Sequence, residues 1–166
     1  MNPALVSVSP EVRAFWARFV ALLACDPSER FYKSFHFDDN QPSADELAEL
    51  VLRGTKRATA ALLWSYESEN KPLPTPGSLS IVTLWSGAPI CVIDTTSVEV
   101  VPFEQVSADF AATEGEGDGS LEFWRRAHTA FFGRECLRIG REFGPSAPVV
   151  CEQFRVVFPA QGENAS

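Results

Sequence analysis

The sequence predicts an α+β fold, built as a small β-barrel or a strongly curved mixed sheet flanked by helices. Three observations lead to this fold class. Apolar residues recur at helical spacing over residues 12–23 and again from Leu121 to about Gly133. Between these segments, residues 79–101 have the period of two that is typical of strands, and residues 149–158 show it again. Hairpin-like connections outnumber any β-α-β pattern, which favours α+β over a parallel α/β sheet.

Each remaining element has a local signal. Ser9-Pro10 is a typical helix start, and residues 31–37 place Phe at alternate positions, as in a half-buried strand. A capping box at residues 43–46 predicts a second helix that ends at Arg53 or at the glycine cap Gly54. A loop is expected over residues 73–77, a short helix over 103–112, an acidic glycine-rich loop over 114–119, and a helix after Ser120.

These elements fit one domain. The 166 residues are 45% hydrophobic and 22% charged, enough for one core without disulfides or metal. We expect a helical extension over residues 1–30 that packs on the main domain, the main domain itself over 31–159, and a flexible tail over 160–166. No apolar run approaches the roughly 20 residues that cross a membrane, and residues 1–9 lack the basic start of a secretion signal. The expected location is the cytoplasm.

The charge limits the partner class. Fourteen Lys and Arg face 22 Asp and Glu, a net charge of −8. A long or duplex nucleic acid usually needs a basic face, so the expected partner is a nucleoside, a nucleotide or a short single-stranded RNA met by a local basic spot. The four cysteines form no C-x-x-C pair, and the histidines, His36 and His128, share no ligand spacing. We predict neither a metal nor an organic cofactor.

The segment Gly54–Thr59 is the best candidate site. It ends a helix and immediately presents Lys56, Arg57 and the Thr59 hydroxyl. Lys56 and Thr59 are three residues apart and can face one pocket. A Thr hydroxyl needs a base beside it, and a desolvated lysine near a second cation can serve as one. The alternative is that these cations complement the negative end of the helix dipole.

The acidic loop and the aromatic residues each allow two interpretations. Glu114, Glu116 and Asp118, separated by glycines, can bring carboxylates to a ligand or to a lysine; alternatively the loop is solvated, with Asp118 or Ser120 capping the next helix. The tryptophans at 64, 85 and 124 are either stacking faces for a base or core residues. His128 lies on an apolar helix face and is expected to be a core residue without a chemical role.

Several of these motifs, in this order, resemble the ASCH domain family, relatives of the RNA-binding PUA domain. The resemblance spans roughly residues 35–158. It is carried by the following segments: 44–51, Gly54-Thr55-Lys56-Arg57-Ala58-Thr59-Ala60, Pro76-Gly77, 95–103, Glu114–Leu121 with Trp124 and His128, and Cys151-Glu152-Gln153-Phe154.

The resemblance implies a small PUA-like β-barrel flanked by helices, with RNA or modified-nucleoside recognition in a cleft. In the amidohydrolase branch of the family, Lys, Thr and Glu deacylate acetylcytidine. They match Lys56, Thr59 and Glu114, with Glu116 second for the acid. Thr59 would attack the amide carbonyl, Lys56 would accept its proton, and Glu114 would position Lys56. Further candidate substrate-binding residues are the following: Arg57, Trp64, Trp85, Glu116 and Ser120.

Two other functions remain open at this point. One is a metal-assisted or metal-free ribonuclease acting on single-stranded RNA, with Lys56 and Arg57 on a phosphate. The other is a non-catalytic RNA- or nucleotide-binding module. For the site geometry we expect Lys56 and Thr59 in one pocket with Trp64 or Trp85. We also expect Glu114 within hydrogen-bond reach of Lys56, and Glu116 more exposed.

Overall fold

The core of the structure is a five-stranded mixed sheet. The computed structural model describes residues 1–160, so the predicted tail, apart from residue 160, lies outside the described residues. The strand order is β1 (Phe31–Phe35), β3 (Leu79–Thr83), β4 (Pro89–Pro102), β5 (Pro148–Phe158) and β2 (Ala58–Leu62). β1 runs parallel to β3, and the other neighbours are antiparallel.

This sheet is open. β1 and β2 form its two edges, so the described residues confirm the mixed sheet flanked by helices and exclude closure into a barrel. Register shifts in the long β4–β5 pair, between Val92 and Ile93 and between Thr95 and Ser97, are the bulges that bend such ribbons. Both predicted strand regions, 79–101 and 149–158, belong to this one sheet.

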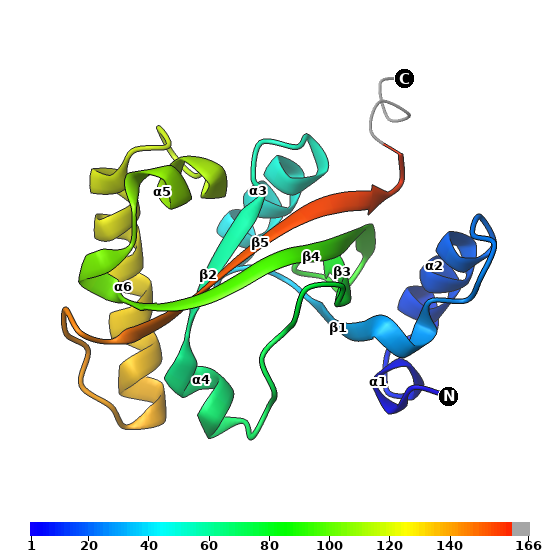
Figure 1. Ribbon diagram of the computed structural model, residues 1–166, viewed down its shortest axis with the longest axis horizontal. Coiled ribbons are helices and arrows are strands. Elements are labelled where there is room, and N and C mark those ends of the chain that lie inside the picture. The colour runs from blue at the N-terminus through cyan, green and yellow to red at the C-terminus, as the bar shows by residue number, and fades with distance from the viewer. Residues whose placement is uncertain (161–166) are drawn as a thin grey trace.

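The helices lie around the sheet in two groups. α1 (Pro3–Val6) and α2 (Pro10–Val20) lie at one end, and α5 (Ala108–Glu114) and α6 (Leu121–Ile139) at the other (Figure 1). α3 (Gln41–Leu52) and α4 (Leu63–Ser68) complete the set, with short 3₁₀ turns at Ser28–Arg30 and Phe103–Gln105.

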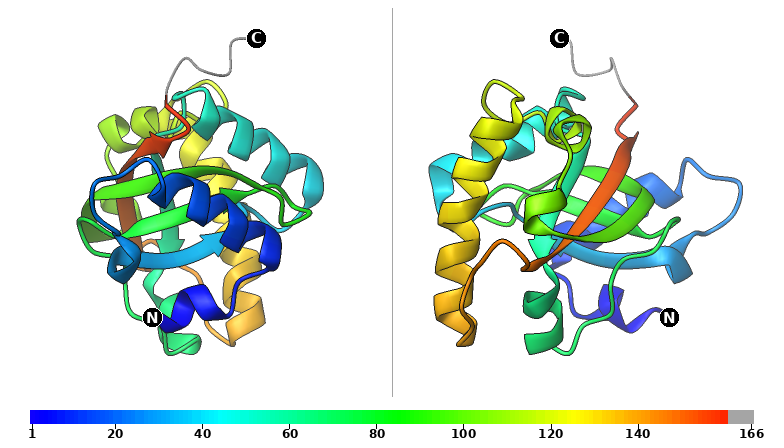
Figure 2. Two further views of the ribbon diagram at one scale, coloured as in Figure 1. Left: turned by 90° about the vertical axis from the view of Figure 1, so that its right-hand side faces the viewer. Right: turned by 60° about the vertical axis from the view of Figure 1, so that its left-hand side comes forward.

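The two faces of the sheet bury different clusters. Alternate residues of β3 and β4 pack under α2, where Trp16 and Phe19 contact Phe31 and Phe158. Figure 2 shows α2 crossing this face. The intervening residues of the same strands pack against α3, and a third cluster, centred on Trp124 and Phe132, fills the space under α5 and α6. The α3 and α6 clusters frame the region that contains the segment Gly54–Thr59.

Several boundaries differ from the sequence expectation, and two elements were not expected. α3 begins after Asn40, whose side chain accepts a hydrogen bond from the Ser43 N–H, so Asn40 and not Ser43 is the cap. α6 runs through Gly133 to Ile139. The segment expected as one helix over 103–112 is a 3₁₀ turn followed by α5. β2 and α4 were not predicted, because each is too short for its period to show.

The predicted glycine cap of α3 is confirmed. Gly54 follows the C-cap residue Arg53 with φ of +80°, a left-handed conformation that glycine adopts without strain. The Thr55 and Lys56 N–H groups then both donate to the Leu50 carbonyl, at 2.9 and 3.0 Å. The turn therefore directs the chain from α3 into β2. Within residues 1–160, no helix is long and apolar enough to cross a membrane.

Candidate functional site

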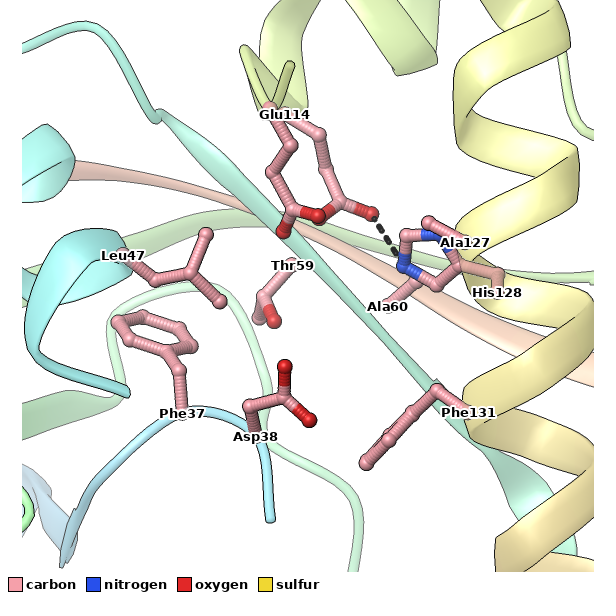
Figure 3. Close-up of a pocket in the computed structure, with 10 residues that line it drawn as sticks. Phe37, Asp38, Leu47, Thr59, Ala60, Glu114, Ala127, His128 and Phe131 are labelled. Carbon is pink, nitrogen blue, oxygen red and sulfur yellow. Dashed lines mark ion pairs between the residues drawn. The ribbon is translucent and has the colours of Figure 1, made fainter. Parts of the chain in front are cut away.

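A pocket opens where β2 passes between α3 and α6. It holds about 430 Å³ of empty space, part of it open to solvent. Its apolar wall is formed by Phe37, Leu47 and Phe131. Its polar lining consists of the following side chains: Asp38, Thr59, Glu114, Glu116 and His128. Figure 3 shows Thr59 in the middle of the pocket, with Glu114 on one side and Asp38 on the other.

Lys56 lies beneath this pocket rather than in it, with 1% of its surface exposed. Its ammonium donates to Glu114 Oε2 at 2.7 Å, to Glu116 Oε1 at 2.8 Å and to the Ala58 carbonyl at 2.7 Å. An ammonium has three N–H donors, so these contacts use all of them. The expectation that Glu114 reaches Lys56 is confirmed, and so is the greater exposure of Glu116, 16% against 1%.

The backbone on either side fixes Lys56 in this place. The Arg57 N–H donates to the Thr113 carbonyl near the end of α5, and the Arg57 carbonyl accepts from the Phe154 N–H of β5. Glu114 is the last residue of α5, and Gly115 follows it with φ of +67°. A Cβ at Gly115 would lie 2.3 Å from the Thr55 carbonyl oxygen. Glycine therefore allows the acidic loop to approach the lysine segment closely.

Glu114 is the centre of a buried hydrogen-bond network. Its Oε1 accepts from the Trp124 indole N–H at 2.7 Å and lies 3.4 Å from His128 Nε2. His128 Nδ1 lies 2.9 Å from the Trp124 carbonyl, which can only accept, so Nδ1 carries a proton and Nε2 is directed to the carboxylate. The His128 ring stacks on the Trp124 indole at 4.1 Å between centroids. Thus α6 supplies two partners to the acid on α5.

The ionisation of the network follows from burial and charge. Burial by itself would lower the pKa of Lys56 and raise that of Glu114, but their mutual attraction dominates: the pKa of Lys56 is raised and that of Glu114 lies well below its usual range. Burial raises the pKa of Glu116; Lys56 opposes the shift and Glu114 adds to it, and the net direction is upward. For His128, burial lowers the pKa but the Glu114 charge outweighs it, so the pKa is raised.

Sequence reasoning missed two pocket residues. It treated His128 as core, although its spacing of four from Trp124 on a helix that follows the acidic loop could have indicated a shared partner. Asp38 lies in the loop after β1 with φ of +54°, a conformation rare for residues other than glycine. Ser43 donates a hydrogen bond to its carboxylate, and Arg134 lies 3.8 Å away. No sequence signal distinguishes Asp38 from the other polar residues of its loop.

The structure brings only part of the predicted set together. Thr59, Glu114 and Glu116 line the pocket and Lys56 supports it, whereas the other four predicted residues are outside the lining. Arg57 is exposed. Ser120 caps α6 by accepting from the Phe123 N–H.

The tryptophan wall that we expected is also absent from the pocket. Trp64 lies under the Arg141 guanidinium at 4.8 Å, and Trp85 packs against His36 at 4.7 Å between ring centroids. Both therefore lie outside the lining, and the described pocket takes its apolar wall from phenylalanines and leucine instead.

The described residues contain one group with the donors for a metal ion. Ligand atoms of Glu114, Glu116 and His128 lie within 4.8 Å of one another. The Lys56 ammonium already contacts both carboxylates and compensates their charge, so a divalent ion would have to displace it. This donor set therefore does not fit a resident metal well.

Comparison with known proteins agrees with the fold and the motif. The family model for the ASCH domain matches residues 33–158. A solved ASCH domain from Lactobacillus crispatus JV V101 is 38% identical, with a TM-score of 0.84 over 90% of this chain and 96% of that one. A protein from Enterococcus faecalis V583 is 31% identical, with a TM-score of 0.78 over 89% and 88% of the two chains. No curated protein matches. The chain belongs to the ASCH domain family, whose members are in general RNA-binding modules with a PUA-like fold.

Proposed function

We propose that this chain is an amidohydrolase that removes the acyl group from an acylated, acetylcytidine-like nucleoside. One observation carries the proposal: the Thr59 hydroxyl lies in a half-enclosed pocket whose wall is a buried, charged network. A hydroxyl nucleophile beside fixed acid–base groups is the arrangement that acyl transfer requires.

The lining chemistry favours a base over a phosphate. Asp38, Glu114 and Glu116 line the pocket, and carboxylates repel a phosphate but accept hydrogen bonds from the amino and amide groups of a nucleobase. Lys56 and Arg57, which a ribonuclease would need on the phosphate, do not line it. These two facts speak against the ribonuclease alternative at this pocket.

In this proposal Lys56 has an electrostatic role. Its three donors are used and its pKa is raised, so it is a poor acceptor for the Thr59 proton. It holds Glu114 and Glu116 in place and neutralises part of their charge. This division of labour replaces the lysine base that the family resemblance suggested, and it leaves proton transfer to a carboxylate on the pocket surface.

Asp38 is the carboxylate that we assign to proton transfer. It faces Thr59 across the pocket, and its position is fixed by Ser43 and a strained backbone (Figure 3). Asp38 takes the hydroxyl proton as the Thr59 oxygen bonds to the amide carbon. It returns the proton to the nitrogen as the C–N bond breaks. Water then hydrolyses the threonyl ester and releases the carboxylic acid.

The developing oxyanion needs a donor. Arg57, a candidate substrate-binding residue from the sequence, is outside the pocket, and its backbone N–H donates to the Thr113 carbonyl. His128 lines the pocket, and its raised pKa favours a protonated Nε2. We therefore assign Nε2 to the oxyanion: its contact with Glu114 Oε1 is long, at 3.4 Å, and in the reaction its proton would turn from that carboxylate to the oxyanion. One well-placed donor is worth about a hundredfold or more in rate.

The test is turnover of acetylcytidine by the purified protein, with cytidine and acetate quantified by chromatography. Thr59→Val keeps the side-chain shape and removes the hydroxyl, so it should abolish turnover; Asp38→Asn should lower kcat by about a hundredfold or more. The matched control is Thr113→Val, because the Thr113 hydroxyl bonds the Asp109 carbonyl on the exposed surface of α5 and is not in the pocket lining. It should behave like the wild type.

Two results would contradict this function. Full turnover by Thr59→Val would remove the nucleophile from the mechanism. Saturable binding of acetylcytidine with no release of cytidine would favour the non-catalytic binding module. A labelled single-stranded RNA, incubated in parallel, reports any cleavage.

A further inference from the structure

A second concavity lies along the edge strand β1, whose continuation in the chain reaches the pocket. We call it the β1 groove and define it by Tyr32, Lys33, His36, Lys71 and Thr83, with residues of α1 and α2 on its other side. It holds about 1050 Å³, part of it open to solvent. Residues 32–36, from β1 and the position after it, line the groove, and the next two residues, Phe37 and Asp38, line the pocket. The two hollows therefore follow one another along the chain.

A pair of phenylalanine rings separates the groove from the pocket. Phe35 lines the groove and Phe37 lines the pocket, and their rings meet edge to face at 5.1 Å. Each ring covers one lysine: Lys33 Nζ lies 4.4 Å from the Phe35 centroid, and Lys56 Nζ lies 5.1 Å from that of Phe37. A ligand that filled the pocket could thus continue into the groove across this ring pair.

The charges of the two hollows are opposite. The pocket is lined by three carboxylates, whereas none of the groove-lining residues in the described part of the chain is acidic. The whole sequence has three lysines; Lys33 and Lys71 line the groove and Lys56 supports the pocket. In a chain of net charge −8, two lysines and no acid in this lining make the groove a local basic spot.

Lys33 has no ionic partner of its own. Within residues 1–160 no carboxylate lies within 4.0 Å of its ammonium, which instead lies near the rings of Phe35, Tyr32 and Tyr66. Burial lowers the pKa of Lys33 to about 8, although Glu152 opposes the shift. An arriving anion would supply the missing countercharge. Lys71 lies on the same Tyr32 ring, 5.6 Å from its centroid, so two cations share one aromatic residue.

An exposed aromatic pair adjoins the groove. Trp85, 40% exposed, packs against His36, which lines the groove, at 4.7 Å between centroids. Exposed rings beside lysines are the combination that binds single-stranded nucleic acid, with bases on the rings and phosphates on the cations. The backbone N–H of Trp85 donates to Asp45 of α3 at 2.9 Å. This contact holds Trp85 near the helix that supplies Leu47 to the pocket.

We propose that the β1 groove binds the phosphates of a short single-stranded RNA whose acylated nucleoside occupies the pocket, with a neighbouring base on Trp85. The substrate of the proposed deacylation is then a modified residue within a strand, and this inference rests on that function. Phosphates contacted by Lys33 and Lys71 position the strand, while the acidic pocket selects the base.

The experiment compares three substrates: free acetylcytidine, its 5′-monophosphate, and a short single-stranded oligoribonucleotide with one internal acetylcytidine. The wild type should have the highest kcat/KM on the oligonucleotide. Lys71→Glu should lower kcat/KM on the oligonucleotide by about tenfold, while kcat/KM on free acetylcytidine should stay unchanged. The slope of log binding constant against log salt concentration should fall by about 0.7 for each phosphate that the variant no longer neutralises. Trp85→Ala should weaken oligonucleotide binding by about fivefold or more.

The matched control is Arg138→Glu, which makes the same charge change at an exposed position near the end of α6. Its kcat/KM on all three substrates should equal that of the wild type. Equal effects of Lys71→Glu and Arg138→Glu on the oligonucleotide would overturn the proposal. A kcat/KM on the monophosphate as high as that on the oligonucleotide would show that the substrate is not a strand. The groove would then be a site for a single phosphate.

Failure of the proposed function is separable from failure of the groove. If the wild type deacylates none of the three substrates, binding of an unmodified oligoribonucleotide, followed by fluorescence anisotropy with the same variants, still tests the groove. Weaker oligoribonucleotide binding by Lys71→Glu than by Arg138→Glu then supports the β1 groove as the binding site. Equal binding by the two variants refutes it.

Discussion

At the scale of single residues, Lys56 is the side chain on which the site depends. A lysine with 1% exposure is stable only when its charge is compensated, and here two carboxylates and a carbonyl surround it. The same contacts bring Glu114 from α5 and Glu116 from the loop beyond it to one point. The residue that resembles a catalytic base in the sequence is therefore a buried countercharge in the folded chain.

Removing this countercharge should be costly. Lys56→Met retains the length of the side chain but removes the only cation that both Glu114 and Glu116 contact in the described residues. We therefore expect the free energy of unfolding to fall by about 3–5 kcal/mol. Urea denaturation at neutral pH measures it. The double variant Lys56→Met/Glu114→Gln removes one of the two charges, and its loss of stability should be smaller than that of the single lysine variant. A single variant within about 1 kcal/mol of the wild type would show that the network is not a stabilising one.

At the scale of elements, two short turns decide where the charged groups meet. Gly54 directs the chain from α3 into β2, and Gly115 ends α5 beside the Thr55 carbonyl. Both use a left-handed backbone, which costs other residues roughly 1–2 kcal/mol. The Gly115 turn has an additional steric requirement, because its Cα faces the backbone of the lysine segment.

Gly115 and Gly140 form a natural comparison. Both end helices with similar φ, +67° and +75°, but a Cβ would lie 2.3 Å from a backbone oxygen at Gly115 and meet nothing within 4 Å at Gly140. Gly140→Ala should cost about 1–2 kcal/mol, from the backbone conformation alone. Gly115→Ala should lower the free energy of unfolding by clearly more. For a chain of this size, each additional kcal/mol lowers the Tm by about 2–4 °C. Equal Tm values in a thermal melt would mean that the loop moves away without penalty.

At the scale of the whole molecule, the N-terminal helix α2 packs directly on the sheet. Trp16 of α2 is 4% exposed, contacts Phe31 of β1 edge to face at 5.0 Å, and donates its indole N–H to Ser28. These contacts join α2 to β1 of the main domain. We predict that the two parts unfold together.

Truncation of the Trp16 side chain tests this. Trp16→Ala should lower the free energy of unfolding by about 3–5 kcal/mol, the usual cost of emptying an aromatic core position. Tryptophan fluorescence and far-ultraviolet circular dichroism should still give one coincident transition. Leu22→Ala, at a position 73% exposed just after α2, is the control and should change little. Two separate transitions would show that α2 is an independent unit.

The sequence by itself determined the features that depend on neighbours in the chain. The fold class, the two long strand regions, the start of α2 at Ser9 and the turn at Gly54 follow from periodicity, caps and glycine conformation, which are local properties. The ordered motifs from Lys56 to Glu114 also identified the family. The contact of these two residues, 58 positions apart, was expected from the family pattern and is confirmed at 2.7 Å.

Only the tertiary structure decided which side chains share the pocket and which do not. Asp38 and His128 enter it because the loop after β1 and the middle of α6 meet at β2, whereas Trp64 and Trp85 lie outside the lining. Nor could the sequence show that β2, five residues long, forms the edge of an open sheet, since its pairing partner β5 begins only at Pro148. Such contacts depend on the relative placement of whole elements, which local periodicity does not encode.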